Sequence, residues 1–182
     1  DQQLLDKFNL VGSYPHWAYS YNSLFDLAAG LSSGGGVIAL RDHHRSHGDI
    51  IEFSNREFYE GRLRVATPYE HLARPDPSAP GISWRDVAGE VQRPGTGGAI
   101  NAAEATAVVE ALNDLVVRRD YQGSIGVVTP FRAQANLIRQ QLTQHESLYE
   151  RLIRQGLLVD TVHKFQGDER DLMVFSPVVS KG

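Results

Sequence analysis

Two patterns of apolar residues alternate along the chain. Short continuous apolar runs are typical of buried strands, and they occupy residues 37–40, 124–130, 157–162 and 171–179. Helical patterns occupy residues 22–31, 49–61, 101–119 and 131–142. Helices that alternate with short apolar strands predict an α/β fold with a mostly parallel sheet flanked by helices.

The predicted helices carry start signals and apolar sides. Asn22 or Ser23 can cap the first helix, and Asn101 with Glu104 resembles a capping box. We expect three of these helices to turn apolar side chains to one side. These residues are Ile50, Ile51, Phe53, Phe58 and Tyr59 at 49–61, Ala105, Val108, Leu112 and Leu115 at 101–119, and Phe131, Ala135, Ile138 and Leu142 at 131–142.

The least regular part of the chain is residues 64–100, where five prolines interrupt any long element. Residues 82–87 (ISWRDV) are the one strand candidate in it. We expect a single domain over residues 1–182, with 1–22 as a lead-in and 64–100 as a surface excursion or a small β insert.

Composition narrows the classes of function. The 182 residues are 41% apolar and carry a formal net charge of −4, which is unusual for a freestanding module that binds nucleic acid by bulk charge but leaves a local basic groove open. The chain has no cysteine, so a disulfide, a thiolate zinc site and a cysteine nucleophile are excluded. We expect no membrane span, since no apolar run approaches the ~18 residues that a span needs. We also expect an intracellular location (cytoplasmic, nucleoid or nuclear).

Three polar segments directly follow predicted strands: residues 41–47, 129–134 and 161–171. In open parallel sheets, ligands bind outside the carboxyl ends of the strands. We therefore expect the three segments to line one edge of one domain and to form a shared site.

The first segment, HHRSH at residues 43–47, allows three interpretations. His43 and His47 have the spacing of a helical zinc pair, but no convincing third ligand accompanies them. Both histidines could instead be hydrogen-bonded at the start of a capped helix. The third interpretation makes Arg45 a ligand for phosphate oxygens, which a guanidinium fork suits.

The other two segments also have more than one interpretation. In TPFRAQ (129–134), a threonine hydroxyl and the start of a helix can bind a phosphate. Phe131 could stack on a base, although an apolar residue at the start of a helix is more often part of a core. In the third segment, Asp168, Glu169 and Asp171 could bind Mg²⁺, or the segment could be a solvated turn. A metal-dependent nuclease fits poorly because Lys164 precedes these acids, so we expect no metal site in the chain.

Motifs of self-sufficient nucleotide enzymes are absent from the sequence. It contains no G-x-x-x-x-G-K-[ST] loop and no G-x-G-x-x-G after a strand. The three segments, in this order, nevertheless resemble one family. The stretches of this chain that carry the resemblance are ALRDHHRSHGDIIEFSNREFYEGRL (39–63), IGVVTPFRAQ (125–134) and VDTVHKFQGDERDLMVFSPVVS (159–180).

These stretches resemble the second, C-terminal RecA-like domain of superfamily 1 helicases, in the branch of the nonsense-mediated-decay and replication-repair helicases. The resemblance runs from about Ser23 to Ser180 and implies a three-layer RecA-like α/β domain. It also implies an ATP site, with Mg²⁺, split between this domain and an N-terminal RecA-like domain of the same chain that carries the P-loop.

The resemblance assigns roles to particular residues of the ATP site. Arg45 matches an arginine finger, which would stabilise transition-state charge at the γ-phosphate. Glu169 matches the glutamate that contacts the nucleotide ribose, in a turn shaped by Gln166 and Gly167.

Contacts to single-stranded DNA or RNA are implied at two places. Thr161 and His163 match positions that meet the nucleic-acid backbone. Thr129, Pro130 and Gln134 match a strand-binding turn.

The family pattern continues past Gly182 to a further arginine motif, so we expect a fragment truncated at its C-terminus and inactive alone. The implied function is ATP-dependent unwinding or translocation by a longer protein. The alternative is a degenerate RecA-like scaffold that binds nucleic acid or partners without hydrolysis.

Overall fold

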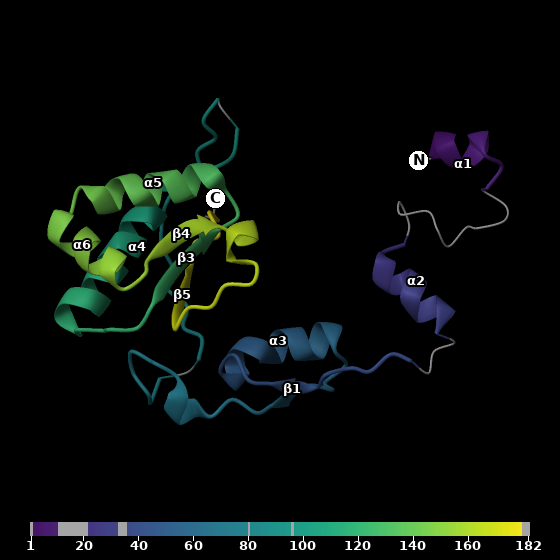
Figure 1. Cartoon of the computed structure of the whole chain (residues 1–182). Helices are drawn as coiled ribbons and strands as arrows, with labels where there is room; N and C mark the ends of the chain where they lie inside the picture. The colour runs from purple at the N-terminus through teal and green to yellow at the C-terminus, as the bar shows by residue number, and fades with distance from the viewer. Residues whose placement is uncertain (1, 11–21, 33–35, 80, 96, 180–182) are drawn as a thin grey trace. The chain divides into compact units, whose positions relative to one another are not determined.

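The computed structural model describes residues 2–10, 22–32, 36–79, 81–95 and 97–179 (Figure 1). The chain divides into two compact units, residues 1–42 and residues 43–182. Residues 1 and 11–21 of the expected lead-in lie outside the described residues.

The first unit contains helix α1 (Gln2–Lys7) and helix α2 (Leu24–Leu31). The predicted start of α2 is confirmed, and Ser23 is its cap. The Asp26 backbone N–H donates to Ser23 Oγ at 3.2 Å, and the Ser23 N–H donates to the Asp26 carboxylate at 2.8 Å. This reciprocal capping box also lowers the pKa of Asp26, because the Ser23 hydroxyl and N–H hydrogen-bond its charged form.

The predicted buried strand at residues 37–40 is wrong. These residues form no strand, and the side chains of Ile38 and Leu40 are 87% and 90% exposed. An apolar run becomes a buried strand only where a neighbouring strand pairs with its backbone, and none of the described strands pairs with this run. Pairing begins two residues later, where β1 (Asp42–His43) joins β2 (Arg64–Val65) in a two-stranded sheet.

The predicted helix at 49–61 is confirmed as α3 (Gly48–Phe58), but its apolar side does not face a core. Ile50, Phe53, Phe58 and Tyr59 are all exposed. The helix is held instead at its two ends. His47 caps its start, and the Asn55 side chain exchanges two hydrogen bonds with the backbone of Leu63, at 2.8 and 3.2 Å.

The core of the second unit is a three-stranded parallel sheet in the order β4-β3-β5, with the central strand β3 at Ile125–Thr129. Strand β4 (Leu158–Thr161) pairs with β3 on one side, and β5 (Leu172–Phe175) pairs with it on the other. All three strands fall within predicted strands. The predicted α/β fold with a parallel sheet flanked by helices is confirmed.

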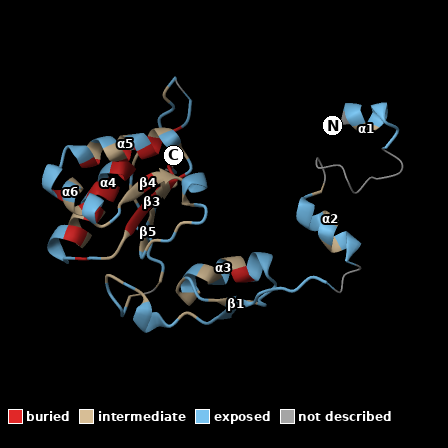
Figure 2. Cartoon of the chain, in the orientation of Figure 1, coloured by how far each residue is buried: buried red, intermediate tan, exposed pale blue. Residues whose placement is uncertain are grey.

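Helices α4 (Ala102–Asn113), α5 (Arg132–Thr143) and α6 (Glu146–Arg154) pack together beside this sheet (Figure 1). Helix α4 continues into the π-helical turn η3 (Asp114–Arg118). Helix α6, which was not predicted from the sequence, buries Leu148 and Leu152. Buried residues gather where these helices meet the strands, as Figure 2 shows. The fully buried apolar members are Ala105, Leu112, Val116, Ile125, Val127, Ala135, Ile138, Leu142 and Leu152.

Residues 64–100 contain little regular structure. Beyond β2, the residues of this stretch that the structure describes form the turn η2 (Tyr69–His71) and an isolated bridge between Gln92 and Ile100. The predicted strand at 82–87 is wrong, and Trp84 in it is 78% exposed. Within the part of the chain that the structure describes, no helix is long and apolar enough to cross a membrane.

Candidate functional site

The second and third polar segments meet at the carboxyl ends of two adjacent strands. Thr129, the last residue of β3, is the register partner of Thr161, the last residue of β4. The chain then enters α5 through Pro130 and Phe131, and enters the 3₁₀ turn η4 (Val162–Phe165) directly after Thr161. The predicted shared edge is therefore confirmed for these two segments.

Thr129 and Gln134 lie inside the protein at this edge. Both side chains are fully buried. The backbone N–H of Phe131 donates to Thr129 Oγ1 at 3.4 Å. The Gln134 amide accepts a hydrogen bond from the Asn101 N–H at 2.9 Å and donates to the Asn101 carbonyl at 3.1 Å and to Ser176 Oγ at 3.2 Å. These contacts hold the turn between β3 and α5 and leave neither side chain open to a ligand.

Glu104 completes this buried network, a role beyond the helix cap that its sequence position predicts. Asn101 caps α4, since the Glu104 N–H donates to Asn101 Oδ1 at 3.1 Å. The Glu104 carboxylate turns to the segment after β5, where it accepts from Ser176 Oγ at 2.5 Å and from the Val178 N–H at 3.1 Å. The carboxylate thereby helps to hold Val178 at a φ of +60°, which is unusual for a β-branched residue.

Pro130, Thr161 and His163 are accessible at the same edge: Pro130 and His163 are exposed, and Thr161 is partly buried. The neighbouring Asp160 accepts a 2.7 Å hydrogen bond from the Thr161 N–H. This bond, together with the charges of Arg139 and Arg132, lowers the pKa of Asp160 against the opposing effect of its burial. Asp160 is thereby kept ionised, and it fixes the backbone at Thr161.

The first segment leads from β1 into α3, and two of its three histidines, His43 and His47, have local roles. His43 Nε2 lies 2.8 Å from Ser46 Oγ and accepts from the Ser46 N–H at 3.1 Å. His47 Nδ1 accepts from the Asp49 N–H at 3.2 Å, and its ring stacks on Tyr69 with centroids 4.2 Å apart. This is the predicted capped helix start with hydrogen-bonded histidines.

Arg45 reaches from this loop to the third segment. Its Nε lies 2.7 Å from Glu169 Oε1, and its Nη2 donates to the Asp168 carbonyl at 2.8 Å. The turn that receives it contains Gly167 at a φ of +82°, a conformation that favours glycine. Gln166 and Gly167 are exposed beside it. All three polar segments are thus joined by direct contacts, although β1 does not belong to the central sheet.

The acidic residues of the third segment point to separate partners. Asp168 pairs with Arg170 at 2.5 Å, Glu169 pairs with Arg45, and Asp171 accepts from the N–H and the hydroxyl of Ser124, both at 2.7 Å. Among the described residues, no group of three or more His, Cys, Asp or Glu side chains converges as a metal site would require.

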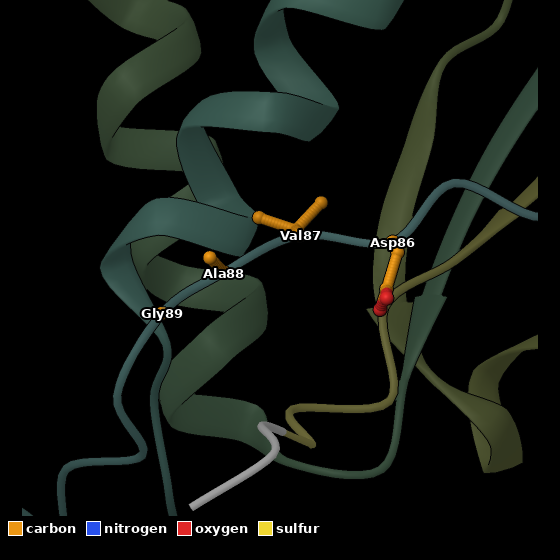
Figure 3. A pocket seen from close by; sticks show the side chains of 4 residues that line it. All are labelled: Asp86, Val87, Ala88 and Gly89. Atoms are coloured by element: carbon orange, nitrogen blue, oxygen red, sulfur yellow. The ribbon is translucent and has the colours of Figure 1, made fainter.

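A hollow of about 300 Å³ lies elsewhere, along Asp86, Val87, Ala88 and Gly89 (Figure 3). Gly89 packs against the Asn101 side chain so closely that a Cβ there would come 2.5 Å from Asn101 Oδ1. No predicted site residue lines this hollow, so we place the candidate site at the strand edge and the Arg45–Glu169 pair.

Comparisons with known proteins identify the class to which this arrangement belongs. A family model described as an AAA domain matches residues 21–182. The chain is 29% identical to the putative helicase mov-10-B.1 of Danio rerio over 161 residues and 28% identical to helicase sen1 of Schizosaccharomyces pombe over 148 residues. It is 27% identical to the regulator of nonsense transcripts 1 homolog of Drosophila melanogaster over 148 residues.

These alignments cover 78 to 79% of this chain and 9 to 16% of the three relatives. A RecA-like α/β unit that carries the three motifs in order is the C-terminal domain of superfamily 1 helicases. The chain belongs to this AAA domain family, whose members here are the helicases of the Upf1, Sen1 and MOV10 type. The predicted family resemblance is confirmed.

Proposed function

We propose that this domain supplies an arginine finger and single-strand contacts to an ATP-dependent helicase or translocase. The observation that carries the proposal is the contact between Arg45 and Glu169. It brings the residue suited to the γ-phosphate and the residue suited to the ribose to one place, although 123 residues separate Arg45 from the neighbouring Asp168.

ATP is the substrate of the proposed site, and its donor set fits a nucleotide. The Arg45 guanidinium can donate to phosphate oxygens, and the Glu169 carboxylate can accept from ribose hydroxyls. Gly167, without a side chain, lets the turn approach the nucleotide closely. We expect the P-loop and the ligands of Mg²⁺ to belong to an N-terminal RecA-like domain.

The strand contacts divide into two groups. We assign direct backbone contacts to Pro130, Thr161 and His163, because they are accessible at the edge of the sheet. Thr129 and Gln134 are positioning residues, since both are fully buried. Exposed Arg132 and Lys164 flank the edge and give it local positive charge, although the net charge of the chain is −4.

Hydrolysis by the two-domain protein tests the proposal. Arg45→Ala should lower strand-stimulated ATP turnover by about 10³-fold or more, the typical effect of an arginine finger. Affinity for a single strand should change less than twofold. The matched control is Arg56→Ala, because Arg56 is exposed on α3 and pairs with its neighbour Glu57 at 2.8 Å.

Unchanged turnover in Arg45→Ala would remove Arg45 from the ATP site. A wild-type two-domain protein that binds a single strand and hydrolyses no ATP would support the scaffold function instead.

A further inference from the structure

We propose that Glu169 holds Arg45 before the nucleotide binds, so that ribose recognition and engagement of the finger are linked through one salt bridge. The inference rests on the proposed function and adds an order of events to it: ATP must separate the two residues before either can act on it.

The contact that supports this inference is directional. Arg45 uses Nε toward the Glu169 carboxylate, at 2.7 Å, and Nη2 toward the Asp168 carbonyl, at 2.8 Å. Two simultaneous bonds fix the plane of the guanidinium against the turn. An arginine held in this way presents part of its donor fork to the protein and not to a phosphate.

The turn is fixed independently of Arg45. Asp168 Oδ1 accepts from the Glu169 N–H at 2.9 Å and from Arg170 Nη1 at 2.5 Å, and Arg170 Nη1 also donates to the Glu169 carbonyl at 2.7 Å. These bonds set the backbone of Glu169 and leave its side chain 70% exposed. Removing the Glu169 carboxylate should therefore leave Arg45 with only its bond to the Asp168 carbonyl, and leave the turn folded.

The two proposed roles conflict with the observed pair. The α- and β-phosphates separate the ribose hydroxyls of ATP from its γ-phosphate, so a carboxylate on the ribose and a guanidinium on the γ-phosphate are drawn apart and lose this bond. Because the two side chains are 51% and 70% exposed, solvent weakens the pair, and an exposed pair of this kind changes an equilibrium by roughly two- to fivefold. The salt bridge is thus strong enough to measure and weak enough for ATP to break.

Glu169 therefore has two opposite effects on nucleotide affinity. It adds hydrogen bonds to the ribose, and it subtracts affinity because it holds Arg45. For a nucleotide without ribose hydroxyls, Glu169 gives no hydrogen bonds to the ribose and still lowers affinity by holding Arg45. Removing the Glu169 carboxylate should weaken binding of ATP and strengthen binding of 2′,3′-dideoxy-ATP.

The experiment measures the affinity of the two-domain protein for the β,γ-imido analogues of ATP and of 2′,3′-dideoxy-ATP by isothermal titration calorimetry. Glu169→Ala should bind the ATP analogue more weakly and the dideoxy analogue about two- to fivefold more tightly. Glu169→Gln, which keeps the shape of the side chain without its charge, should also tighten dideoxy binding. Glu57→Ala removes a comparable exposed salt bridge from α3 and should change neither affinity.

An Arg45→Ala background provides the decisive comparison, since adding Glu169→Ala to it should no longer tighten dideoxy binding. Tightening that persists without Arg45, or no tightening in Glu169→Ala, would overturn the linkage. The two proposals fail separately. If Arg45→Ala abolishes turnover but Glu169→Ala does not tighten dideoxy binding, the finger stands and the linkage falls. If Arg45→Ala leaves turnover unchanged, the proposed function itself falls.

Discussion

Gln134→Ala should destabilise the domain, because this side chain is a structural link between two helices and the end of β5. The substitution removes three hydrogen bonds that Gln134 makes to the Asn101 N–H, the Asn101 carbonyl and the Ser176 hydroxyl. Each group is left in a fully buried place, since Asn101, Gln134 and Ser176 are all at 0% exposure.

The expected magnitude follows from the cost of buried groups without partners. One such group costs about 1–3 kcal/mol, and a typical intramolecular hydrogen bond contributes about 0.5–1.5 kcal/mol net. The Ser176 hydroxyl keeps Glu104 as a partner, and the Asn101 carbonyl keeps the Ala105 N–H at 3.0 Å, so the main loss falls on the Asn101 N–H. Alanine regains a few tenths of a kcal/mol through its helix propensity. We expect a net loss of about 2 kcal/mol in the free energy of unfolding.

Urea unfolding of the 182-residue chain, followed by circular dichroism, measures this loss. Gln140→Ala is the matched control, because Gln140 is an exposed glutamine on the same helix and its substitution should change stability by less than about 0.5 kcal/mol. Equal unfolding midpoints for Gln134→Ala and Gln140→Ala would refute the structural role. In that case the original expectation of a direct strand contact by Gln134 would regain its support.

Two further predictions concern other parts of the domain. Burial and the charge of Asp171 raise the pKa of Tyr121 to about 12. Between pH ~10 and 12 the unfolded chain loses the phenol proton while the folded chain keeps it. The free energy of unfolding is therefore highest below pH ~10 and falls as the pH rises toward 12. Tyr121→Phe also removes the 2.6 Å hydrogen bond to the Ala73 carbonyl, so urea unfolding should show about 1 kcal/mol less stability at pH 7. The variant should also lose less stability than the wild type between pH 10 and 12. An equal loss in both proteins would contradict the raised pKa of Tyr121. Thr161→Ala and His163→Ala should each weaken single-strand binding by the two-domain protein severalfold and leave basal ATP turnover intact, as measured by fluorescence anisotropy and phosphate release. His145→Ala, at an exposed histidine before α6, is the control, and an unaltered affinity in both edge variants would leave Thr161 and His163 structural.

The strands of the sheet could be predicted because each is a short, continuous apolar run, which is typical of a strand buried in a parallel sheet. Ile125 and Val127 lie in a short apolar run, and both become fully buried in the central strand. Residues 37–40 have the same apolar character but are unpaired and exposed, since a run of four apolar residues cannot specify which strand edge will accept it. Helix α6 was not predicted although its sequence carries the signal, because Leu148 and Leu152 stand four residues apart on one side of the helix and both are buried.

The site shows a similar division. The topology rule for parallel sheets anticipated that Thr129 and Thr161 would lie at one edge, and the register places them opposite each other. Burial could not be anticipated for Gln134, because glutamine is usually exposed and its partners Asn101 and Ser176 are distant in sequence. Glu104 resembled half of a capping box, yet its carboxylate accepts hydrogen bonds from Ser176 and Val178, which are 72 and 74 residues away in the sequence. Sequence spacing predicts local bonds and does not predict such long-range ones.

The most direct test of the central proposal is a crystal structure of the two-domain protein with ADP, aluminium fluoride, Mg²⁺ and a single strand, which imitates phosphoryl transfer. We expect the Arg45 guanidinium to leave Glu169 and to lie within hydrogen-bonding distance of the fluoride, with the Glu169 carboxylate on the ribose hydroxyls. An Arg45 that stays 2.7 Å from Glu169, or that turns to solvent while the fluoride is bound, would contradict the assignment of the finger.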